Sequence, residues 1–509
     1  MQVAYSADDV RAAEAPLLAA GVPLMERAAF ALATKVLAEL RAVRGTTWGA
    51  RVVVLVGAGN NGGDGLHAAA VLARRGVGVT VVTTTARTHP GGLAVARAAG
   101  VDVLALGDIG TSAAADLVWE ADLVLDALVG IGGDGTGVRG EAGHLLTELV
   151  VSARPRPRRT RPVVVAVDVP SGVGVDDGTV AGTVLPADLT VTFGALKPGV
   201  LLPPGDRVAG RVELVDLGLD LLGATVAVRR LDAAGAAAAW PVPGVADHKY
   251  TRGVLGLVAG TARYPGAAVL AAAGAVGAGV GMVRFVDEHD DPGPLAAAVL
   301  AARPEVVVGA GRVQAWAAGS GVDPADPARR GDLAQVLAAA RSGVPAVLDA
   351  GALVGAGYLG PHVVLTPHAG ELADLLTERG APTTRAEVEA APLAAARAAH
   401  WATGATVLLK GPTTMVVGPG VVYAQADAPA WLATAGAGDV LTGILGALLA
   451  GWVPRIADNP DWPAALAATA ALVHGRAAHL ANPGGPVSAA AVAAAVPAVV
   501  AELLARPVS

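Results

Sequence analysis

The chain has 509 residues, of which 53% are hydrophobic and 16% are charged, with a net charge of −7 at pH 7 and no cysteine. This length exceeds what one hydrophobic core usually supports, so we expect two domains. The lack of cysteine excludes disulfides, thiolate metal sites and cysteine nucleophiles. The charge balance gives no indication of a nucleic-acid partner.

Three segments indicate where the protein is located and whether it binds nucleic acid or membranes. The basic segment Arg154–Arg161 is interrupted by prolines and lacks aromatic residues, which favours a solvated loop over a nucleic-acid site. The N-terminus carries Asp8, Asp9 and Glu14 without the basic and then apolar pattern of a signal peptide. The uncharged run Tyr264–Val283 is dominated by alanine and glycine, which favours a core helix over a membrane span. We therefore expect a cytoplasmic homo-oligomer that binds neither nucleic acid nor membranes.

A predicted helix at Ser6–Ala19, capped by Ser6, precedes the most informative stretch of the chain, Arg51–Leu66. This stretch reads RVVVLVGAGNNGGDGL, in which a β-branched run predicts a buried strand and is followed by a turn with five glycines. Glycines let a backbone approach a phosphate closely, and a helix N-terminus adds partial positive charge. The stretch therefore predicts a site for an anionic ligand.

The glycines of this turn fit the G-x-G-x-x-G pattern, but the acid that holds a ribose in that pattern is missing. The next predicted strand ends in the threonines Thr83–Thr85, so an ordinary redox NAD site is disfavoured. We interpret Asn60, Asn61 and Asp64 as groups that bind a ligand or an ion through side-chain oxygens. A tight turn without a ligand is the alternative.

Strand-like runs alternate with helices rich in alanine and leucine, which predicts two α/β domains, the first a Rossmann-like, doubly wound sheet. The predicted strands are Val52–Val56, Val77–Thr83, Val101–Ala105, Leu123–Leu125, Val163–Val167, Leu189–Phe193 and Val212–Val215, and then Gly253–Ala259, Met282–Val286, Glu305–Val308, Ala346–Asp349, Val363–Thr366, Val407–Lys410 and Met415–Val417. The segment Asp220–Asp247 is poor in strand pattern, so we place the boundary near residues 230–245. The predicted domains are 1–225 and 240–509.

Polar residues also stand at the ends of later strands in the first domain. Asp126 ends the fourth predicted strand before a second glycine-rich turn, and Asp168 follows Val163–Val167. Because open parallel sheets bind ligands at the carboxyl ends of their strands, these turns should meet at one cleft. Asn61, Asp126 and Ser171 could supply oxygen ligands to a cation, and Asp168 is the best candidate for a general acid or base. Each could instead be a cap or turn residue.

Four motifs of this domain, GAGNNGGDG, DALVGIGGDG, AVDVPSG and FGALKPG, resemble the epimerase domain of the NAD(P)H-hydrate repair enzymes over about residues 1–218. The resemblance implies interconversion of the R and S forms at the hydroxylated ring carbon of hydrated NADH or NADPH, with Asp168 as the catalytic residue. It also implies that K⁺ is bound by Asn61, Asp126 and Ser171. The residues implied to hold the hydrated dinucleotide are Asn60, Asn61, Gly62, Gly63, Asp64, Gly130, Ile131, Gly132, Gly133, Asp134, Gly135, Thr136 and Asp168.

The strongest signal of the second half is Ala433–Gly443, ATAGAGDVLTG, which opens a predicted apolar helix that runs through Leu449. Small residues before Asp439 leave bare amides at a helix start, which form an oxyanion site, and the adjacent carboxylate can act as a base. Phosphoryl transfer requires both features. An N-capping aspartate is the alternative.

Two further strand ends carry polar residues. The segment Leu408–Thr414, LLKGPTT, places Lys410 and hydroxyl groups where they could reach a phosphate, and Thr366–Glu371, TPHAGE, places His368 and Glu371 at a neighbouring strand end. His368 alone could equally be an ordinary histidine. No G-x-x-x-x-G-K-[ST] loop occurs, which excludes a P-loop nucleotidase by pattern.

The motifs HKYTRG, YPGAAVLAA, VVVGAG, VLDAGAL, LTPHAGEL, LLKGPTT and TAGAGDVLTGIL resemble the ADP-dependent NAD(P)H-hydrate dehydratases, which have a ribokinase-like fold, over about residues 240–505. The resemblance implies that ADP phosphorylates the hydrate hydroxyl and that phosphate then leaves, with Asp439 as catalytic base and Mg²⁺ neutralising charge. The residues implied to hold the hydrate are Ala267, Gly311, His368 and Asp439, and those implied to hold ADP are Lys410, Gly411, Pro412, Thr413, Thr414 and Gly438. The chain departs from the pattern at Gly351 and Ala435, where an acid and a glycine are usual.

Together the two resemblances predict a bifunctional enzyme, an isomerase and a lyase, whose small-molecule substrates are hydrated NADH and NADPH and whose co-substrate is ADP. The alternative is a ribokinase-like kinase of the hydroxymethylpyrimidine or sugar type, using ATP and fused to a non-catalytic binding module. The TPHAGE and LLKGPTT pair argues against the kinase. The presence of Asn61, Asp126 and Asp168 argues against a non-catalytic first half.

Overall fold

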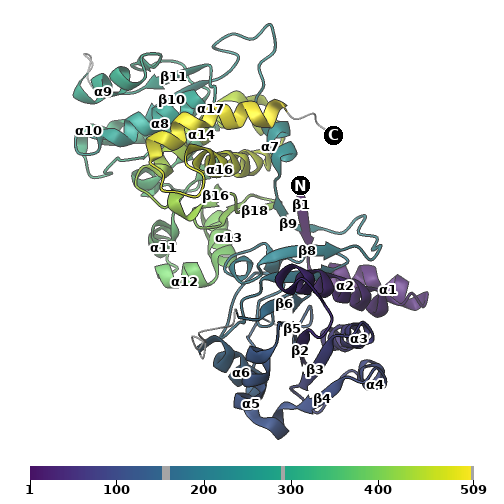
Figure 1. Ribbon diagram of the computed structural model, residues 1–509. Helices are drawn as coiled ribbons and strands as arrows, with labels where there is room; N and C mark the ends of the chain where they lie inside the picture. The colour runs from purple at the N-terminus through teal and green to yellow at the C-terminus, as the bar shows by residue number, and fades with distance from the viewer. Residues whose placement is uncertain (134, 152–160, 288–292, 506–509) are drawn as a thin grey trace. The chain divides into compact units, whose positions relative to one another are not determined.

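The computed structural model describes residues 1–133, 135–151, 161–287 and 293–505. Two predicted features fall outside the described residues, namely Asp134 and all of the basic segment except Arg161. The chain forms two compact units, Val3–Ala227 and Val228–Ser509 with Met1–Gln2, and each is described by itself (Figure 1).

The N-terminal unit is a parallel sheet with helices on both faces. Its elements are α1 (Ala7–Ala19), α2 (Leu24–Arg44), β2 (Arg51–Val56), α3 (Asn60–Arg74), β3 (Gly78–Thr83), α4 (Pro90–Ala98), β4 (Asp102–Ala105), α5 (Leu106–Glu120), β5 (Leu123–Ala127), α6 (Gly140–Val151), β6 (Val163–Val167), β7 (Leu189–Phe193) and β8 (Arg211–Val215). The strand β1 (Gln2–Tyr5) precedes them and takes no part in this sheet. The strand order is β4-β3-β2-β5-β6-β7-β8, and neighbouring strands are parallel throughout. Every strand predicted for this half is present within two residues of its predicted bounds, and the predicted doubly wound fold is confirmed.

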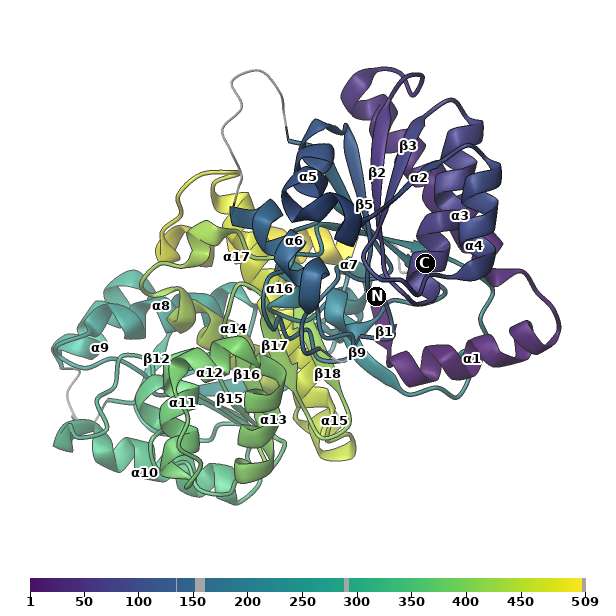
Figure 2. The ribbon, with the colours of Figure 1, turned by 90° about the horizontal axis from the view of Figure 1, so that it is seen from below.

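Strand β2 shows why this sheet needs helices on both sides. Val54 and Val56 pack into the core on the side of α2 and α3, whereas Val53 and Leu55 pack into the core on the side of α5 and α6. Alternate residues of a strand point to opposite faces, so a continuous apolar run requires two covered faces. Figure 2 shows α2, α3 and α4 on one side of β2, β3 and β5, with α5 and α6 on the other.

The strand order reverses direction between β2 and β5, which is the position where open α/β sheets bind ligands. The glycine-rich turn after β2 and the turn after β5 therefore lie side by side. The helix after β2 begins within the glycine-rich turn, at Asn60, with Gly59 as its N-cap. Asn60 and Asn61 consequently belong to the first turn of α3. At the chain start, Ser6 caps α1 as predicted by accepting a hydrogen bond from the Asp9 amide.

The C-terminal unit is also a helix-covered α/β sheet. Its elements are β9 (Val226–Arg230), α7 (Ala233–Ala239), β10 (Val254–Val258), α8 (Pro265–Gly277), β11 (Met282–Phe285), α9 (Pro294–Ala302), β12 (Val307–Val308), β13 (Ala315–Ala318), α10 (Pro327–Arg341), β14 (Ala346–Leu348), β15 (Val363–Leu365), α11 (Ala369–Glu378), α12 (Arg385–Ala390), α13 (Pro392–Thr403), β16 (Thr406–Leu409), β17 (Thr414–Val417), β18 (Val422–Gln425), α14 (Ala437–Gly451), α15 (Val453–Asp458), α16 (Trp462–Ala481) and α17 (Ala489–Ala505). From β9 the strand order is β9-β18-β17-β16-β15-β14-β13-β10-β11-β12. The strands from β12 to β16 run parallel, and β17 pairs antiparallel with both β16 and β18.

All strands predicted in the second half are present, but β9, β13 and β18 were not predicted. The prediction that Asp220–Asp247 is poor in strands was wrong at Val226–Arg230, because this segment forms β9, which pairs with β18. The uncharged run near residue 264 forms α8, whose alanines are mostly buried, as predicted. Among the described helices, none alone has the length and apolar composition to cross a membrane, although the pair α1 and α2, bent by 114°, meets those criteria together.

Candidate active sites

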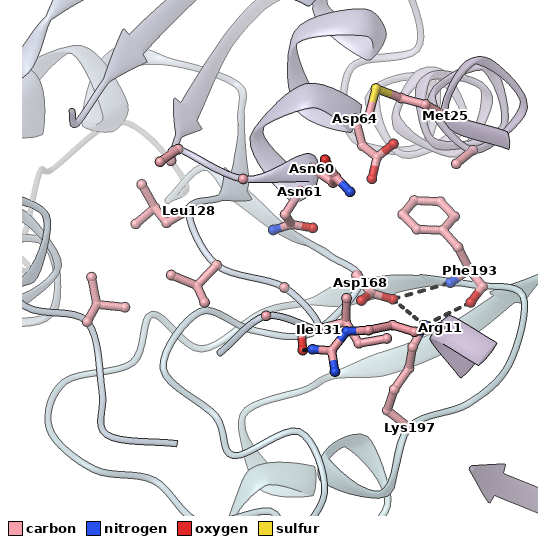
Figure 3. A pocket seen from close by; sticks show the side chains of 18 of the residues that line it. Arg11, Met25, Asn60, Asn61, Asp64, Leu128, Ile131, Asp168, Phe193 and Lys197 are labelled. Carbon is pink, nitrogen blue, oxygen red and sulfur yellow. Dashed lines mark hydrogen bonds and ion pairs between the residues drawn. The ribbon is translucent and has the colours of Figure 1, made fainter. Parts of the chain in front are cut away.

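A cavity of about 680 Å³ lies at the carboxyl ends of β2 and β5 in the N-terminal unit (Figure 3). Of the residues implied to hold the hydrated dinucleotide, those that line this cavity are Asn60, Asn61, Asp64, Gly130, Ile131, Gly132, Thr136 and Asp168. Gly62, Gly63, Gly133 and Gly135 are not among the lining residues. A Cβ on Gly62 would lie 2.3 Å from the Gly57 carbonyl oxygen, so this glycine allows α3 to start close against the end of β2.

Asp168 is held in an unusual backbone conformation at the edge of the cavity. Its φ of 70° lies in the left-handed region, which residues other than glycine seldom adopt. The carboxyl Oδ1 accepts hydrogen bonds from Lys197 Nζ at 2.5 Å, Thr192 Oγ1 at 3.0 Å and the Phe193 amide at 3.4 Å. Three donors on one oxygen suit the ionised carboxylate, which only accepts hydrogen bonds. The three contacts fix the position of this group.

Lys197 is a functional candidate that was not predicted. Its side chain is 2% exposed, and its ammonium also donates to the Thr192 hydroxyl at 3.1 Å and to the Phe193 carbonyl at 2.8 Å. A lysine is almost never buried without a partner, so a lysine inside the apolar motif FGALKPG is itself a signal for a buried ion pair. No local pattern identifies Asp168 as that partner.

Two of the three predicted K⁺ ligands touch each other directly. The Asp126 carboxylate, which is fully buried, accepts hydrogen bonds from the Ser171 hydroxyl at 2.6 Å and the Ser171 amide at 2.9 Å. Burial raises the pKa of Asp126, and the bonds from Ser171 and the Leu128 amide oppose the rise. The same hydroxyl lies 3.2 Å from the carbonyl oxygen of Val129.

Asn61, the third predicted K⁺ ligand, lies in the first turn of α3. Both polar atoms of its side-chain amide are buried and have no hydrogen-bond partner. Its Oδ1 lies so close to Gly130 that a Cβ there would be 2.7 Å away. Buried amides are nearly always satisfied, so this one indicates room for a ligand that contributes the missing contact. Within the described residues no group of three or more His, Cys, Asp or Glu could hold a metal ion, so a cation here would need amide, hydroxyl or carbonyl oxygens beside the single carboxylate of Asp126.

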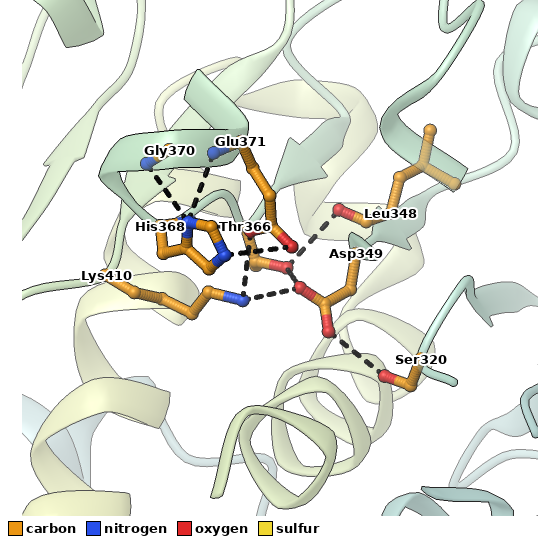
Figure 4. Close-up of polar contacts among 8 residues, drawn as sticks. All are labelled: Ser320, Leu348, Asp349, Thr366, His368, Gly370, Glu371 and Lys410. Carbon is orange, nitrogen blue, oxygen red and sulfur yellow. Dashed lines mark hydrogen bonds and ion pairs between the residues drawn. The ribbon is translucent and has the colours of Figure 1, made fainter. Parts of the chain in front are cut away.

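In the C-terminal unit, four consecutive parallel strands each end in a polar residue that joins one cluster (Figure 4). Ser320 follows β13, Asp349 follows β14, Thr366 follows β15 and Lys410 follows β16. The buried carboxylate of Asp349 accepts from Lys410 at 2.7 Å, from Thr366 at 2.9 Å and from Ser320 at 3.1 Å. Asp349 is therefore the hub of the cluster.

Lys410 also approaches a second carboxylate, since its Nζ lies 3.7 Å from Glu371 Oε2. Burial alone would lower the pKa of Lys410, but the charges of Asp349 and Glu371 outweigh it and raise the pKa. Glu371 and His368 form a capping box at the start of α11, in which the His368 ring accepts from the amides of Gly370 and Glu371, each at 3.1 Å. The capping role accounts for the hydrogen bonds of the His368 ring without any ligand. His368 nevertheless lies beside Lys410.

Asp439 lies in the first turn of α14, the apolar helix predicted through Leu449. The N-cap of this helix is Gly436, with a φ of 86°, and no side chain caps it, so Asp439 is not the capping residue. Burial raises the pKa of Asp439 to about 6, and the charge of Asp349 adds to the rise, whereas Ser320 and Lys410 oppose it. A carboxylate with this pKa is poised to accept a proton near neutral pH.

Most of the other predicted residues of this unit lie around the same cluster. Gly438 faces Lys410, because a Cβ on it would lie 3.5 Å from Nζ, and Ala267 of α8 packs against Gly321, next to Ser320. Gly411, Pro412, Thr413 and Thr414 form the turn from Lys410 into β17. Gly311 lies after β12 against the Arg284 guanidinium, and no hydrogen bond or ion pair of the described residues links it to the cluster.

The two departures from the family pattern, Gly351 and Ala435, lie in different structural environments. Gly351 lies in a short 3₁₀ turn where a Cβ would meet the Val322 carbonyl oxygen at 2.0 Å, so the local backbone leaves no space for an acid. Ala435 is exposed and immediately precedes Gly436, and nothing in the structure explains why glycine is replaced there.

Comparison with known proteins followed the same division of the chain. Residues 21–199 match the family model described as YjeF-related protein N-terminus, and residues 255–494 match the model described as NAD(P)H-hydrate dehydratase. The bifunctional NAD(P)H-hydrate repair enzyme Nnr of Mycobacterium tuberculosis (strain ATCC 25618 / H37Rv) is 43% identical over 468 residues, covering 88% of this chain and 89% of the relative. The NAD(P)H-hydrate epimerase of Clavibacter michiganensis subsp. michiganensis is 51% identical over 229 residues, covering 44% of this chain and 94% of the relative. Among solved structures, an ADP/ATP-dependent NAD(P)H-hydrate dehydratase from Bacillus subtilis, co-crystallised with ATP/Mg²⁺, aligns with a TM-score of 0.46 and 24% identity over 54% of this chain and 99% of that one.

These features define a two-domain enzyme. Its first unit is doubly wound and has an acid-lined cavity, and its second is an α/β unit with a carboxylate at a glycine-rich helix start. The chain belongs to the family of bifunctional NAD(P)H-hydrate repair enzymes. The resemblance found in the motifs of both halves is thereby confirmed.

Proposed function

We propose that this chain repairs hydrated NADH and NADPH in two steps. The N-terminal unit interconverts the R and S hydrates, and the C-terminal unit converts the S hydrate and ADP into NAD(P)H, AMP and phosphate. The observation that carries the proposal is that each unit contains its own carboxylate near the carboxyl ends of its parallel strands, the buried Asp168 in one and the partly exposed Asp439 in the other. The names of relatives that match one or both halves support the same pair of activities.

In the N-terminal unit, the cavity suits a dinucleotide whose phosphates lie at the start of α3. The amides of Asn60–Asp64 and the turn after β5 would hold it, because a helix N-terminus favours anions. The hydrated ring would then reach Asp168 on the opposite wall. The hydroxylated carbon is next to a ring nitrogen, whose lone pair helps the hydroxyl to leave and return on the other face.

We assign the K⁺ ion to Asn61, Asp126 and Ser171. The residues fit such an ion, because the Asn61 amide is buried without a partner and the other two supply oxygens. When bound, the ion would supply positive charge beside the turn after β5. Asn61 would then gain the contact that its side chain lacks.

In the C-terminal unit, Lys410–Thr414 and Gly438 would hold ADP with its terminal phosphate against Asp439. Asp439 accepts the proton of the hydrate hydroxyl, the hydroxyl oxygen bonds to the terminal phosphorus, and AMP leaves. Phosphate then leaves from the ring carbon while the neighbouring carbon loses a proton, which forms the double bond of NAD(P)H. Mg²⁺ is normally held by nucleotide phosphates together with one or two carboxylates. The partly exposed Glu371 would supply such a carboxylate here.

The direct test is to incubate the full-length protein with mixed R and S hydrates, ADP and Mg²⁺ while the absorbance of reduced nicotinamide is followed. Complete conversion of both forms requires both activities. Conversion of only the S form would leave the epimerase part of the proposal without support, and no conversion would contradict it entirely.

The nucleotide preference gives the first specific prediction. We expect ADP to support the reaction well, ATP to support it poorly, and AMP to accumulate in step with NAD(P)H. A longer phosphate tail should misplace the reacting phosphorus, and a misplacement of about 1 Å can cost on the order of 100-fold in rate. Chromatography of the nucleotides measures this. A protein that prefers ATP, releases ADP and phosphorylates a pyrimidine or sugar would instead be the kinase considered above.

The pH dependence of dehydration gives a second prediction. A base must be ionised to act, and the pKa of Asp439 is raised to about 6, so the rate at limiting substrate should rise with pH and reach half its plateau near pH 6. Asp349→Asn removes a negative charge that raises this pKa, so the midpoint should move to lower pH in that variant. A midpoint that stays in place would show that another group titrates.

A further inference from the structure

Inversion at the hydroxylated carbon requires two proton carriers, and only Asp168 has been assigned so far. If the hydroxyl leaves as water, one group must protonate it, and when water returns on the opposite face another group must take up a proton. This argument rests on the proposed epimerase function. The second carrier must therefore lie in the same cavity as Asp168, on another wall.

Asp64 of α3 meets this requirement by position. It lines the cavity, and Figure 3 shows its carboxyl pointing from α3 toward Asp168 and Phe193 on the opposite wall. Asp168 comes from the turn after β6, so the two carboxyls reach the cavity from different elements. A ring bound between them would present one face to each.

The two carboxyls have opposite hydrogen-bonding environments. Asp168 is bound by three donors, one of them the Lys197 ammonium. Within the described part of the chain, the Asp64 carboxyl forms no hydrogen bond or ion pair. Nothing around Asp64 therefore stabilises its charged form in the way that Lys197 stabilises that of Asp168.

The charges around Asp64 also favour its protonated form. Burial raises the pKa of Asp64 well above its usual value, and the negative charges of Asp168 and of Glu14 on α1 raise it further, whereas Lys197 lowers it. Burial also raises the pKa of Glu14. A carboxyl group whose pKa is raised in this way can serve as a proton donor.

The cavity wall carries two other cations, Arg11 and Arg139, and neither is among the charges that shift the pKa of Asp64. Arg11 of α1 lines the cavity, but its guanidinium donates to the Ile131 carbonyl oxygen at 2.7 Å and pairs with Asp8 at 2.7 Å. Lys197 is thus the positive charge that lowers the pKa of Asp64, and its ammonium is already hydrogen-bonded to Asp168.

We propose that Asp64 is the proton donor and Asp168 the proton acceptor in one direction of the epimerisation, with the roles exchanged in the other. Asp64 gives its proton to the hydroxyl oxygen, the carbon–oxygen bond breaks, water leaves and the ring nitrogen shares its lone pair with the carbon. A water molecule then bonds to the opposite face of that carbon and gives a proton to Asp168. The hydroxyl oxygen of the product comes from solvent, and the two carboxyls return to their starting states by exchanging protons with water.

The test uses the full-length protein, a pure S hydrate, no ADP, and chromatographic separation of the R and S forms in H₂¹⁸O. In the wild type, each inversion should incorporate one ¹⁸O. Asp64→Asn keeps the size of the side chain but cannot donate a proton, so kcat should fall by roughly 10²–10⁴-fold with little change in KM. Asp64→Glu should recover part of that loss.

A second variant tests the environment of Asp64. Glu14→Gln removes a charge that raises the pKa of Asp64, so the rate should fall at lower pH than in the wild type as Asp64 loses its proton. ADP-dependent dehydration of the S hydrate by the same Asp64→Asn preparation shows that the C-terminal unit is folded, and thermal unfolding compared with the wild type reports on the N-terminal unit.

Three results would overturn the inference while leaving the epimerase function intact. These are full epimerisation by Asp64→Asn, a raised KM with unchanged kcat, which would make Asp64 a binding residue only, or inversion without ¹⁸O uptake. A wild-type protein that cannot invert the hydrate at all would instead overturn the proposed function on which the inference rests.

Discussion

Asp439→Asn is expected to abolish the ADP-dependent formation of NAD(P)H while R and S hydrates continue to interconvert. The substitution removes the only carboxylate at the start of α14 and preserves its shape, and loss of a positioned base costs roughly 10²–10⁴-fold in rate. Absorbance of reduced nicotinamide measures dehydration, and chromatography of the hydrates without ADP measures epimerisation.

Asp374→Asn is the matched control, because Asp374 is an exposed acid on α11 of the same unit and should leave both activities unchanged. Near-normal dehydration by Asp439→Asn would remove this residue from the mechanism. Loss of both activities would indicate a folding defect, which thermal unfolding would detect.

Asp168→Asn should block use of the R hydrate, so that with ADP and Mg²⁺ present about half of a racemic mixture remains after spontaneous inversion is subtracted. Asparagine tolerates the left-handed backbone better than most residues, so the turn should survive the change. The amide cannot neutralise Lys197, and a buried charge without its partner is costly, so we also expect a lower melting temperature.

Dehydration of the S hydrate by the same preparation reports whether the remainder of the chain is folded. Asp102→Asn, at an exposed acid of β4, is the control for this unit and should convert both hydrates. Consumption of both forms by Asp168→Asn at the wild-type rate would show that Asp168 is not required.

Most strands were predicted from local sequence, and a central strand that was not predicted shows where local patterns stop being informative. Strand β13, with the sequence AWAA, lies in the middle of the sheet yet carries no β-branched residue. It is accommodated because it pairs with β10, where Gly256 lies opposite Trp316 and leaves space for the indole ring. This compensation joins residues 60 positions apart, and no local pattern reveals it.

The site predictions had a similar limit. Asp439 and Asp168 stand out locally, since each is an acid beside glycines or at the end of an apolar run. Asp349 and Ser320 do not, because their importance arises from the order of four strands that brings them to Lys410. The motif VLDAGAL contained Asp349, but only its departure at Gly351 was weighed.

The left-handed backbone at Asp168 also restricts how this position can change over evolutionary time. Most side chains are strained at a φ of 70°, whereas glycine and asparagine adopt it readily. A descendant that no longer needed the acid would therefore be expected to keep the turn by acquiring one of these two residues rather than drifting freely. Glycine or asparagine at this position would then mark a lineage in which the fold persists after the chemistry has been lost.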